Sequence, residues 1–248
     1  MNFKIDYYFK EIEKDEIFYK LINNKEEVLE IFDESYEFIE LIKAKGQQEI
    51  HTNKIGDNVK IIGSVYIGEG TEIQNGCIIE GPVYIGKNCK LLYNAYIRPG
   101  TILGSDCVIG FCSEVKHTIM RDGSKVSDLA FVGDSIIGKN SRIGSGVIVA
   151  NRGFNQSDII IKDENKNPIN LKRDVMGIVL GDNSRIGSNA TTSPGTFIGM
   201  FTWIFPHTCI HGFIPSEKKV YDKQNLVFLE NEKKVLYKAT EWNRENYS

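Results

Sequence analysis

The sequence predicts an all-β solenoid, a parallel β-helix of about seven coils preceded by a helical segment, because it carries a six-residue repeat. Every sixth residue from Ile55 is a branched aliphatic, in the series Ile55, Ile61, Ile67, Ile73, Ile79, Ile85, Leu91, Ile97, Leu103, Ile109 and Val115. A period of six fits neither the 3.6-residue period of an α-helix nor the alternation of a simple meander. It is typical of short strands joined by tight turns and wound into coils.

A second column of mostly small or β-branched residues lies four positions after the first. Its members are Val59, Val65, Thr71, Cys77, Val83, Cys89, Ala95, Thr101, Cys107, Ser113 and Ile119. The residue before this column is often Gly, Asn or Asp, which tolerate a left-handed backbone. We therefore expect three six-residue units to form one triangular coil with both columns inside. Each buried aliphatic would contribute about 1.5–3 kcal/mol.

The repeat is interrupted twice. Its register slips after Val115 and resumes at Phe131, and it breaks again before resuming at Leu180. We therefore predict two loops that leave the solenoid, near 118–126 and 152–174. Long loops on a regular scaffold often carry function.

The β-helix itself is predicted to span 47–212. Residues 1–46 have a helical apolar pattern that stops at Gly46, and we expect this helical cap to cover the open edge of the first coil. Residues 213–248 form a C-terminal tail, in which two short apolar runs, Leu226–Leu229 and Val235–Tyr237, could pair as a hairpin.

Composition excludes several classes of protein. The 248 residues include 30 Lys+Arg and 33 Asp+Glu, a net charge of −3 that gives no sign of a nucleic-acid partner. No apolar run near the N-terminus suggests a signal peptide, and the uncharged stretch 186–216 is too rich in Pro, Gly, Ser and Thr for a bilayer span. Five cysteines without a CxxC pair argue against disulfides and a zinc ribbon. We expect a cytoplasmic protein with no membrane partner.

A narrower resemblance rests on four elements in a fixed order: RPG at 98–100, EVK at 114–116, VGDSIIG at 132–138 and AN at 150–151. With the repeat, they resemble the acetyltransferase domain of the bifunctional glucosamine-1-phosphate N-acetyltransferase / N-acetylglucosamine-1-phosphate uridylyltransferase and related archaeal sugar-1-phosphate nucleotidyltransferases. The resemblance covers about Ile55 to Pro215.

The resemblance implies a left-handed β-helix that assembles as a homotrimer, with acetyl-CoA as co-substrate between neighbouring subunits. Members of that family begin with a nucleotidyltransferase domain whose Gly-rich loop does not occur in residues 1–54, so we do not expect uridylyl transfer. Some left-handed β-helices bind zinc through three histidines. His207 and His211 are four residues apart instead of five, and His51 is remote, so no metal site is predicted.

The resemblance assigns Arg98 and Lys116 to the phosphate of a sugar substrate. A guanidinium suits this task because it binds two oxygens at once. Glu114 of the same EVK element could orient a sugar hydroxyl or amine, and Asn151 matches the family asparagine beside the acetyl group. The alternative is that Arg98 and Lys116 project from solenoid corners into water and that Asn151 opens a loop.

Three positions depart from the family. Asp128 stands in place of the catalytic His, Phe131 in place of a neighbouring Tyr, and Arg142 in place of an Asn of the bacterial proteins. An unperturbed Asp has a pKa of about 3.9 against about 6.5 for His, so Asp128 is a weaker candidate base unless burial at a subunit interface raises its pKa. His117 could supply an imidazole. Because adjacent strand residues face opposite ways, we expect it outside the Lys116 pocket unless the backbone bulges.

Two functions follow. The first is acyl transfer, with an acetyl group moving from acetyl-CoA to an amino-sugar phosphate or nucleotide sugar and Asp128 as base. The second is a non-catalytic trimeric sugar-phosphate-binding or scaffold protein that has lost its base, and that could partner a separate nucleotidyltransferase. Loss of the His and of the Tyr hydroxyl favours the second function, whereas retention of Arg98, Lys116 and Asn151 favours the first.

Overall fold

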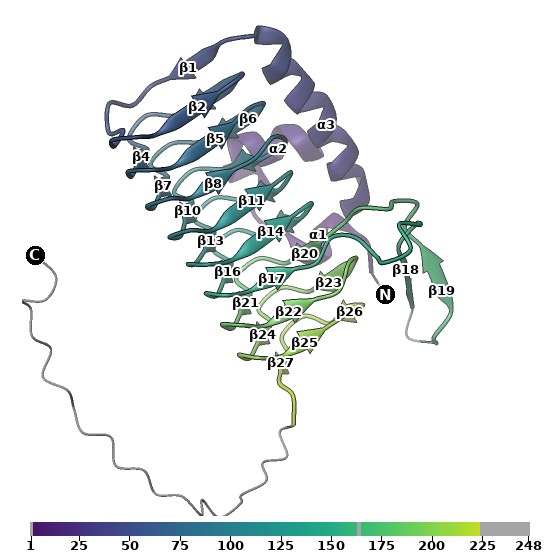
Figure 1. Cartoon of the computed structure of the whole chain (residues 1–248). Coiled ribbons are helices and arrows are strands. Elements are labelled where there is room, and N and C mark those ends of the chain that lie inside the picture. Colours follow the sequence, from purple (N-terminus) through teal and green to yellow (C-terminus); the bar gives the residue numbers. More distant parts are fainter. Residues whose placement is uncertain (1, 163–164, 224–248) are drawn as a thin grey trace, which may run out of the picture.

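The structure is a computed structural model that describes residues 2–162 and 165–223 (Figure 1). Its body is a parallel β-helix in which every coil contributes one strand to each of three sheets. This is the left-handed parallel β-helix that the sequence predicts. The sheets have nine, eight and eight strands, so the prediction of about seven coils was too low. It omitted the residues between Val115 and Phe131 and those beyond both ends of the repeat.

We number the sheets so that each complete coil passes through sheet I, then sheet II and then sheet III. Sheet I has the order β1 (Gln48–Ile50), β3 (Val65–Ile67), β6 (Val83–Ile85), β9 (Ile102–Leu103), β12 (Ile119–Met120), β15 (Ile136–Ile137), β20 (Ile178–Leu180), β23 (Thr196–Ile198) and β26 (Phe213–Ile214). Sheet II contains β4 (Glu72–Ile73), β7 (Lys90–Leu91), β10 (Val108–Ile109), β13 (Lys125–Val126), β16 (Arg142–Ile143), β21 (Arg185–Ile186), β24 (Trp203–Ile204) and β27 (Lys219–Val220). Sheet III contains β2 (Lys60–Ile62), β5 (Ile78–Glu80), β8 (Tyr96–Ile97), β11 (Glu114–Lys116), β14 (Phe131–Gly133), β17 (Ile148–Val149), β22 (Thr191–Thr192) and β25 (Cys209–Ile210).

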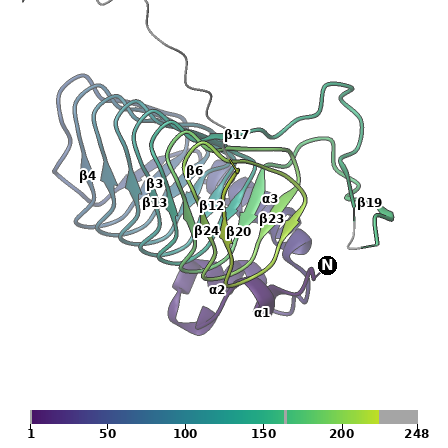
Figure 2. The ribbon, with the colours of Figure 1, turned by 90° about the horizontal axis from the view of Figure 1, so that it is seen from below.

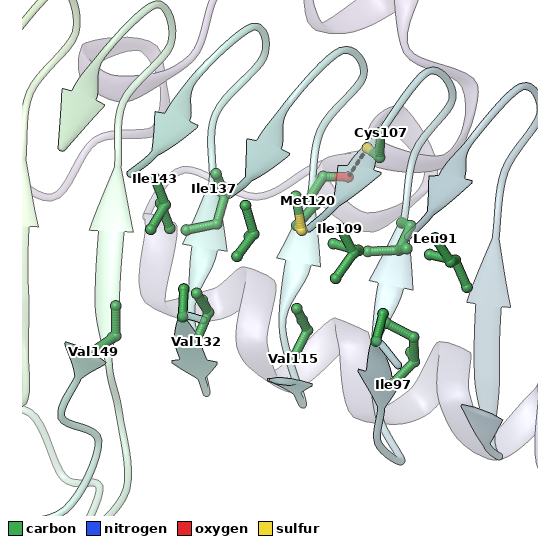
Figure 3. Close-up of a cluster of buried hydrophobic side chains, with 14 of the residues drawn as sticks. Leu91, Ile97, Cys107, Ile109, Val115, Met120, Val132, Ile137, Ile143 and Val149 are labelled. Carbon is green, nitrogen blue, oxygen red and sulfur yellow. Dashed lines mark hydrogen bonds between the residues drawn. The ribbon is translucent and has the colours of Figure 1, made fainter. Parts of the chain in front are cut away.

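From Ile61 onward the aliphatic column fills the inside of the solenoid, where each side chain stacks on its counterpart in the next coil (Figure 3). Ile55, at the uncovered end of the solenoid, is 37% exposed. Leu91 pairs with Ile109, and Ile97 with Val115, and all four are fully buried. The small column also faces inward. Cys107 donates from its thiol to the carbonyl of Met120 and is buried, as expected for a space-filling residue.

The loop predicted near 118–126 does not leave the solenoid, because these residues form β12 and β13. Ile119 pairs with Ile102 before it and with Ile136 after it, so these coils have 17 residues instead of 18. The residue is lost at the corner between sheets III and I. Counting by six cannot follow such a deletion, and for this reason the buried residue of β14 is Val132 and not Phe131.

From Ile55 to Val220, the six-residue step is kept at every corner between sheets I and II and between sheets II and III. Every departure lies at the corner between sheets III and I, here called the III/I corner. Two coils are one residue short there. One corner is two residues short, since Ile198 pairs with Ile214. The longest insertion, between β17 and β20, also begins there.

The predicted loop at 152–174 corresponds to that insertion, here called the hairpin arm, which contains an antiparallel hairpin of β18 (Ile160–Lys162) and β19 (Pro168–Asn170). Its apolar side chains Ile159, Ile161 and Leu171 are buried against the outside of sheet I and the N-terminal helices. At the other boundary, β26 and β27 extend the solenoid to Val220, beyond the predicted 212. The hairpin predicted at 226–237 lies outside the described residues.

The N-terminal segment contains α1 (Ile5–Tyr8), η1 (Ile12–Lys14), α2 (Glu16–Ile22) and α3 (Val28–Lys45). A capping box of Glu27 and Glu30 begins α3, and Gly46 ends it in the left-handed conformation, φ 62°. These helices lie along the outer face of sheet I (Figure 2). They do not cover the open edge of the first coil, which is where they were expected from the sequence. Strands of sheet I are accordingly buried on both faces. No helix within the described ranges has the length and apolar character needed to cross a bilayer.

A buried ion cluster fastens this segment to the solenoid. The fully buried guanidinium of Arg121 donates to both carboxylate oxygens of Asp182, at 2.8 and 2.9 Å, and to Asp15 at 3.2 Å. It also donates to the carbonyl of Lys10 and lies over the ring of Phe18. Asp15 caps α2, so one cation joins the helices to two different coils.

We expect Arg121→Met to lower the free energy of unfolding by about 3–5 kcal/mol, because two buried carboxylates would lose their cation. Denaturant unfolding followed by circular dichroism measures this loss. Arg185→Met is the matched control, since Arg185 is exposed on sheet II and should cost less than about 1 kcal/mol. Equal losses for the two variants would contradict the role given to Arg121.

Candidate functional site

Several charged and polar residues come together on the outer face of sheet III. Glu114 of β11 lies between Tyr96 and Phe131 of the neighbouring strands, and Lys116 lies beside Gly133. Alternate residues of a strand face the same way, and strands are about 4.8 Å apart. Residues separated by a whole coil in sequence therefore form one surface next to the III/I corner. We call Arg98, Glu114, Lys116, His117, Asp134 and Asn151 the corner cluster.

Asp134 lies at the centre of the corner cluster and is 6% exposed. Its carboxylate accepts hydrogen bonds from Lys116 Nζ at 3.3 Å, from His117 Nδ1 at 3.1 Å and from Asn151 Nδ2. Burial would by itself raise the pKa of Asp134, but the hydrogen bonds from His117 and Asn151 and the charge of Lys116 hold that pKa below its ordinary value. Asp134 is therefore an ionised, fully engaged acceptor.

The shortened coils create this arrangement. A step of 17 residues superimposes Gly100, His117, Asp134 and Asn151 along the corner, where His117 (φ 46°) and Asp134 (φ 50°) are both left-handed. The irregular corner turns His117 toward the same carboxylate as Lys116. His117 was expected outside the Lys116 pocket unless the backbone bulged. The irregular backbone at this corner meets that exception, so His117 and Lys116 share the pocket.

His117 is enclosed on several sides. Its side chain is 13% exposed, and the ring of Tyr36 from α3 packs against it at a tilt of 36°, with 4.4 Å between centroids. A methyl group at Gly100 would overlap the edge of the imidazole. Nδ1 pairs with Asp134, whereas Nε2 is buried and has no hydrogen-bond partner within the described part of the chain.

Arg98 forms the other end of the corner cluster. Its guanidinium donates to Glu114 at 2.6 Å and lies 5.8 Å from the centre of the Tyr96 ring. The side chains of Arg98 and Lys116 are still 37% and 32% exposed, so a ligand can reach both cations. The hydrogen bond from Arg98 to Glu114 raises the pKa of Arg98, which keeps its positive charge.

Gly133 lets the ring of Phe131 approach Asn151 of the corner cluster. A Cβ atom at this position would lie 2.9 Å from Asn151 Nδ2 and 3.0 Å from Cζ of Phe131. A larger residue at Gly133 would therefore displace the amide of Asn151 and crowd the ring of Phe131. Phe131 thus faces outward beside Asn151, and Arg98, Glu114, Lys116, Phe131 and Asn151 share one surface.

Asp128 and Arg142 are not part of this surface. Asp128 is exposed in the turn between β13 and β14, at the corner between sheets II and III, and Oδ1 accepts a hydrogen bond from the backbone of Phe111 at 2.9 Å. Asp122 binds the backbone of Ser105 in the same way at another corner, so this contact stabilises a turn. Within one chain, the strand β14 separates Asp128 from Asp134.

Arg142 instead lines a groove of about 290 Å³ on the outer face of sheet II. The groove combines two guanidinium groups, of Arg142 and Arg185, with the rings of Trp203 and Phe205. Nearby, the ammonium of Lys219 lies 5.2 Å from the centre of the Trp203 ring. Among the residues that the structure describes, no three His, Cys, Asp or Glu gather as metal ligands would.

Comparison with known proteins identifies the family. Residues 79–225 match the family described as "GMPPB C-terminal domain". The chain belongs to this family. A protein of Methanococcus aeolicus called "Bifunctional protein GlmU" is 34% identical over 174 residues, which cover 70% of this chain and 42% of the relative. A "Bifunctional sugar-1-phosphate nucleotidylyltransferase/acetyltransferase" of Sulfurisphaera tokodaii is 40% identical over 157 residues, 63% of this chain and 39% of the relative.

These relatives confirm the resemblance stated from the sequence motifs. The chain spans about two fifths of the length of the two relatives. Among solved structures, the UDP-N-acetylglucosamine acyltransferase of Francisella novicida matches with a TM-score of 0.40 and 16% identity, over 66% of this chain and 60% of that chain.

Asp134→Asn should change how stability depends on pH. Because the folded pKa of Asp134 is below its unfolded value, its ionised form contributes stability that is fully present above about pH 4 and is lost as pH falls through the folded pKa. The variant should therefore have a lower Tm at pH 7 and a smaller loss of Tm between pH 7 and pH 3. Thermal unfolding at both pH values measures this. Asp158→Asn, in the exposed part of the hairpin arm, is the control, and an equal response of both variants would contradict the assignment.

Proposed function

We propose that this protein transfers an acetyl group from acetyl-CoA to the amino group of a sugar phosphate or nucleotide sugar bound at the corner cluster. The observation that carries the proposal is the pair of accessible cations on neighbouring strands, Arg98 and Lys116, beside the amide of Asn151. The name of the Sulfurisphaera tokodaii relative includes both sugar-1-phosphate chemistry and acetyltransferase activity, which supports this choice of substrate class.

A phosphate fits these two cations in charge and in size. A phosphate monoester carries between one and two negative charges at pH 7 and offers three acceptor oxygens. One oxygen pair can face the planar guanidinium of Arg98 while another oxygen meets the ammonium of Lys116. Glu114 and Asp134, which now pair with these cations, fix their positions before the ligand arrives.

The groove of sheet II fits the nucleotide end of CoA. Arg142 and Arg185 can pair with its phosphates, and the indole of Trp203 offers a flat surface for the adenine. Bound acetyl-CoA would supply the activated acyl carbon. The amide of Asn151 can donate to the acyl oxygen, where negative charge develops during the reaction.

We also propose that the protein is a homotrimer in which the corner cluster of one copy faces the sheet II groove of another. Exposed apolar side chains support this assembly. Tyr93, Phe111 and Leu129 follow one another on successive coils at the corner between sheets II and III, and all are at least 43% exposed. Contiguous exposed apolar side chains on a rigid surface often mark an interface.

A second candidate, a non-catalytic sugar-phosphate-binding protein, has one observation in its favour. Asp128, at the position of the family base, is engaged in a turn contact with the backbone of Phe111. Binding of CoA distinguishes the two candidates.

Titration calorimetry with acetyl-CoA and then with glucosamine-1-phosphate tests the proposal. We expect micromolar binding of acetyl-CoA, and at least tenfold weaker binding of the sugar phosphate to Arg98→Ala and to Lys116→Ala. The control Lys90→Ala removes an exposed cation from sheet II and should bind like the wild type. If the protein binds the sugar phosphate but not CoA, the acyltransferase proposal is wrong and the non-catalytic binding protein is supported. If it binds neither compound, both proposals are wrong.

The assembly is tested by light scattering coupled to size-exclusion chromatography. The wild type should elute with three times the mass of one chain, and Phe111→Asp should shift it to one chain because a carboxylate would be buried in the interface. Leu41→Asp, at a 67% exposed position of α3, should leave the trimer intact. A monomeric wild type would refute the assembly.

A further inference from the structure

We propose that His117, oriented by Asp134, is the general base of this acyl transfer and that the ring of Tyr36 is a movable cover over it. The observation behind this inference is the juxtaposition of the three side chains at one corner, with Nε2 of His117 left buried and unpartnered beneath the ring. The inference rests on the proposed function and names the residue that would take the proton.

The hydrogen bond to Asp134 selects the tautomer of His117. An ionised carboxylate can only accept, so the proton of the neutral imidazole lies on Nδ1. Nε2 then carries the free lone pair. A histidine held in this way can accept a proton at Nε2, and the carboxylate stabilises the imidazolium that forms.

The other ionisable side chains of the corner cluster are already engaged. Glu114 accepts from Arg98, and Asp134 accepts from three donors. Lys116 is a cation paired with Asp134. Buried polar atoms almost always have a partner, and leaving one unpaired costs about 1–3 kcal/mol. Nε2 of His117 is therefore the atom of the cluster that can accept a proton.

The amine nitrogen of the acceptor attacks the acyl carbon of the thioester, so that an N–C bond forms and the C–S bond breaks. His117 Nε2 accepts the proton that the amine loses, and the leaving sulfur of CoA then takes that proton. Asp134 stays ionised throughout and holds the ring in place.

Tyr36 must move for this step, and the structure allows it to do so. Its ring lies over the imidazole, yet the residue is 51% exposed. Burial and the charge of Asp134 raise the pKa of the Tyr36 hydroxyl, so it remains neutral. Among the described residues that hydroxyl has no hydrogen-bond partner, so rotation of the side chain breaks no hydrogen bond.

The first experiment reads the histidine directly and needs no substrate. Long-range ¹H–¹⁵N correlation spectra of the full chain should show His117 with a protonated Nδ1 and an unprotonated Nε2. In Asp134→Asn this signature should be replaced by a mixture of tautomers. A wild-type His117 with the proton on Nε2, or a signature that Asp134→Asn leaves unchanged, would overturn the inference.

The second experiment tests the cover. Diethyl pyrocarbonate acylates accessible imidazole nitrogens, and mass spectrometry gives the rate at each histidine. Tyr36→Ala should make His117 react at least tenfold faster while exposed His51 keeps its rate. An unchanged rate at His117 would show that Tyr36 does not control access.

The third experiment measures turnover with acetyl-CoA and glucosamine-1-phosphate. His117→Gln should lower kcat by about a hundredfold or more, with little change in sugar-phosphate affinity by calorimetry. His51→Gln should retain kcat, and Asp128→Asn compares His117 with the base expected from the sequence. A loss of turnover in Asp128→Asn but not in His117→Gln would overturn the inference. A wild type that binds neither compound would instead refute the proposed function, while the tautomer and acylation results would stand independently.

Discussion

The requirement that each inward side chain stands on its counterpart in the previous coil determines the rest of this structure. Along a strand, removal of one residue would exchange the inner and outer faces of everything that follows. At a corner, the same removal leaves the stacked columns intact. From Ile55 to Val220 the chain departs from the regular step only at the III/I corner, and the corner cluster lies beside those departures. Regular packing at two corners thus leaves the third corner free to vary in length.

The parts of the fold that depend on this stacking could be predicted from the sequence, and the irregular parts could not. The aliphatic column from Ile55 to Val115 and its return at Leu180 are as expected, because a strict period of six needs no knowledge of other segments. Counting by six failed at Phe131, since one residue is missing from the corner before it. Motif resemblance located Lys116 and Asn151 but missed Asp134, which joins them. A step of 17 through Gly100, His117, Asp134 and Asn151 is the signal that would have found it.

Tyr36 was beyond any prediction of this kind, for a different reason. The apolar face of α3 says that the helix packs against something, but not that it lies along sheet I with Tyr36 at the corner. That placement comes from contacts between distant segments. Arg121 ties Asp15 at the start of α2 to the solenoid, and Arg173 of the hairpin arm binds Asp33 of α3 at 2.6 Å. The packing that secures the helices therefore also positions the ring over His117.

The confinement of irregular turns to one corner of the coils divides the molecule into a constant scaffold and a variable surface. Segments of different length can enter at the III/I corner, as the hairpin arm does, while the coils on either side remain in register. Substitutions there can change the surface beside the corner cluster without disturbing the stacked interior. In such a molecule, surface chemistry and thermal resistance can diverge separately among relatives, and a protein engineer could exchange the hairpin arm as a unit.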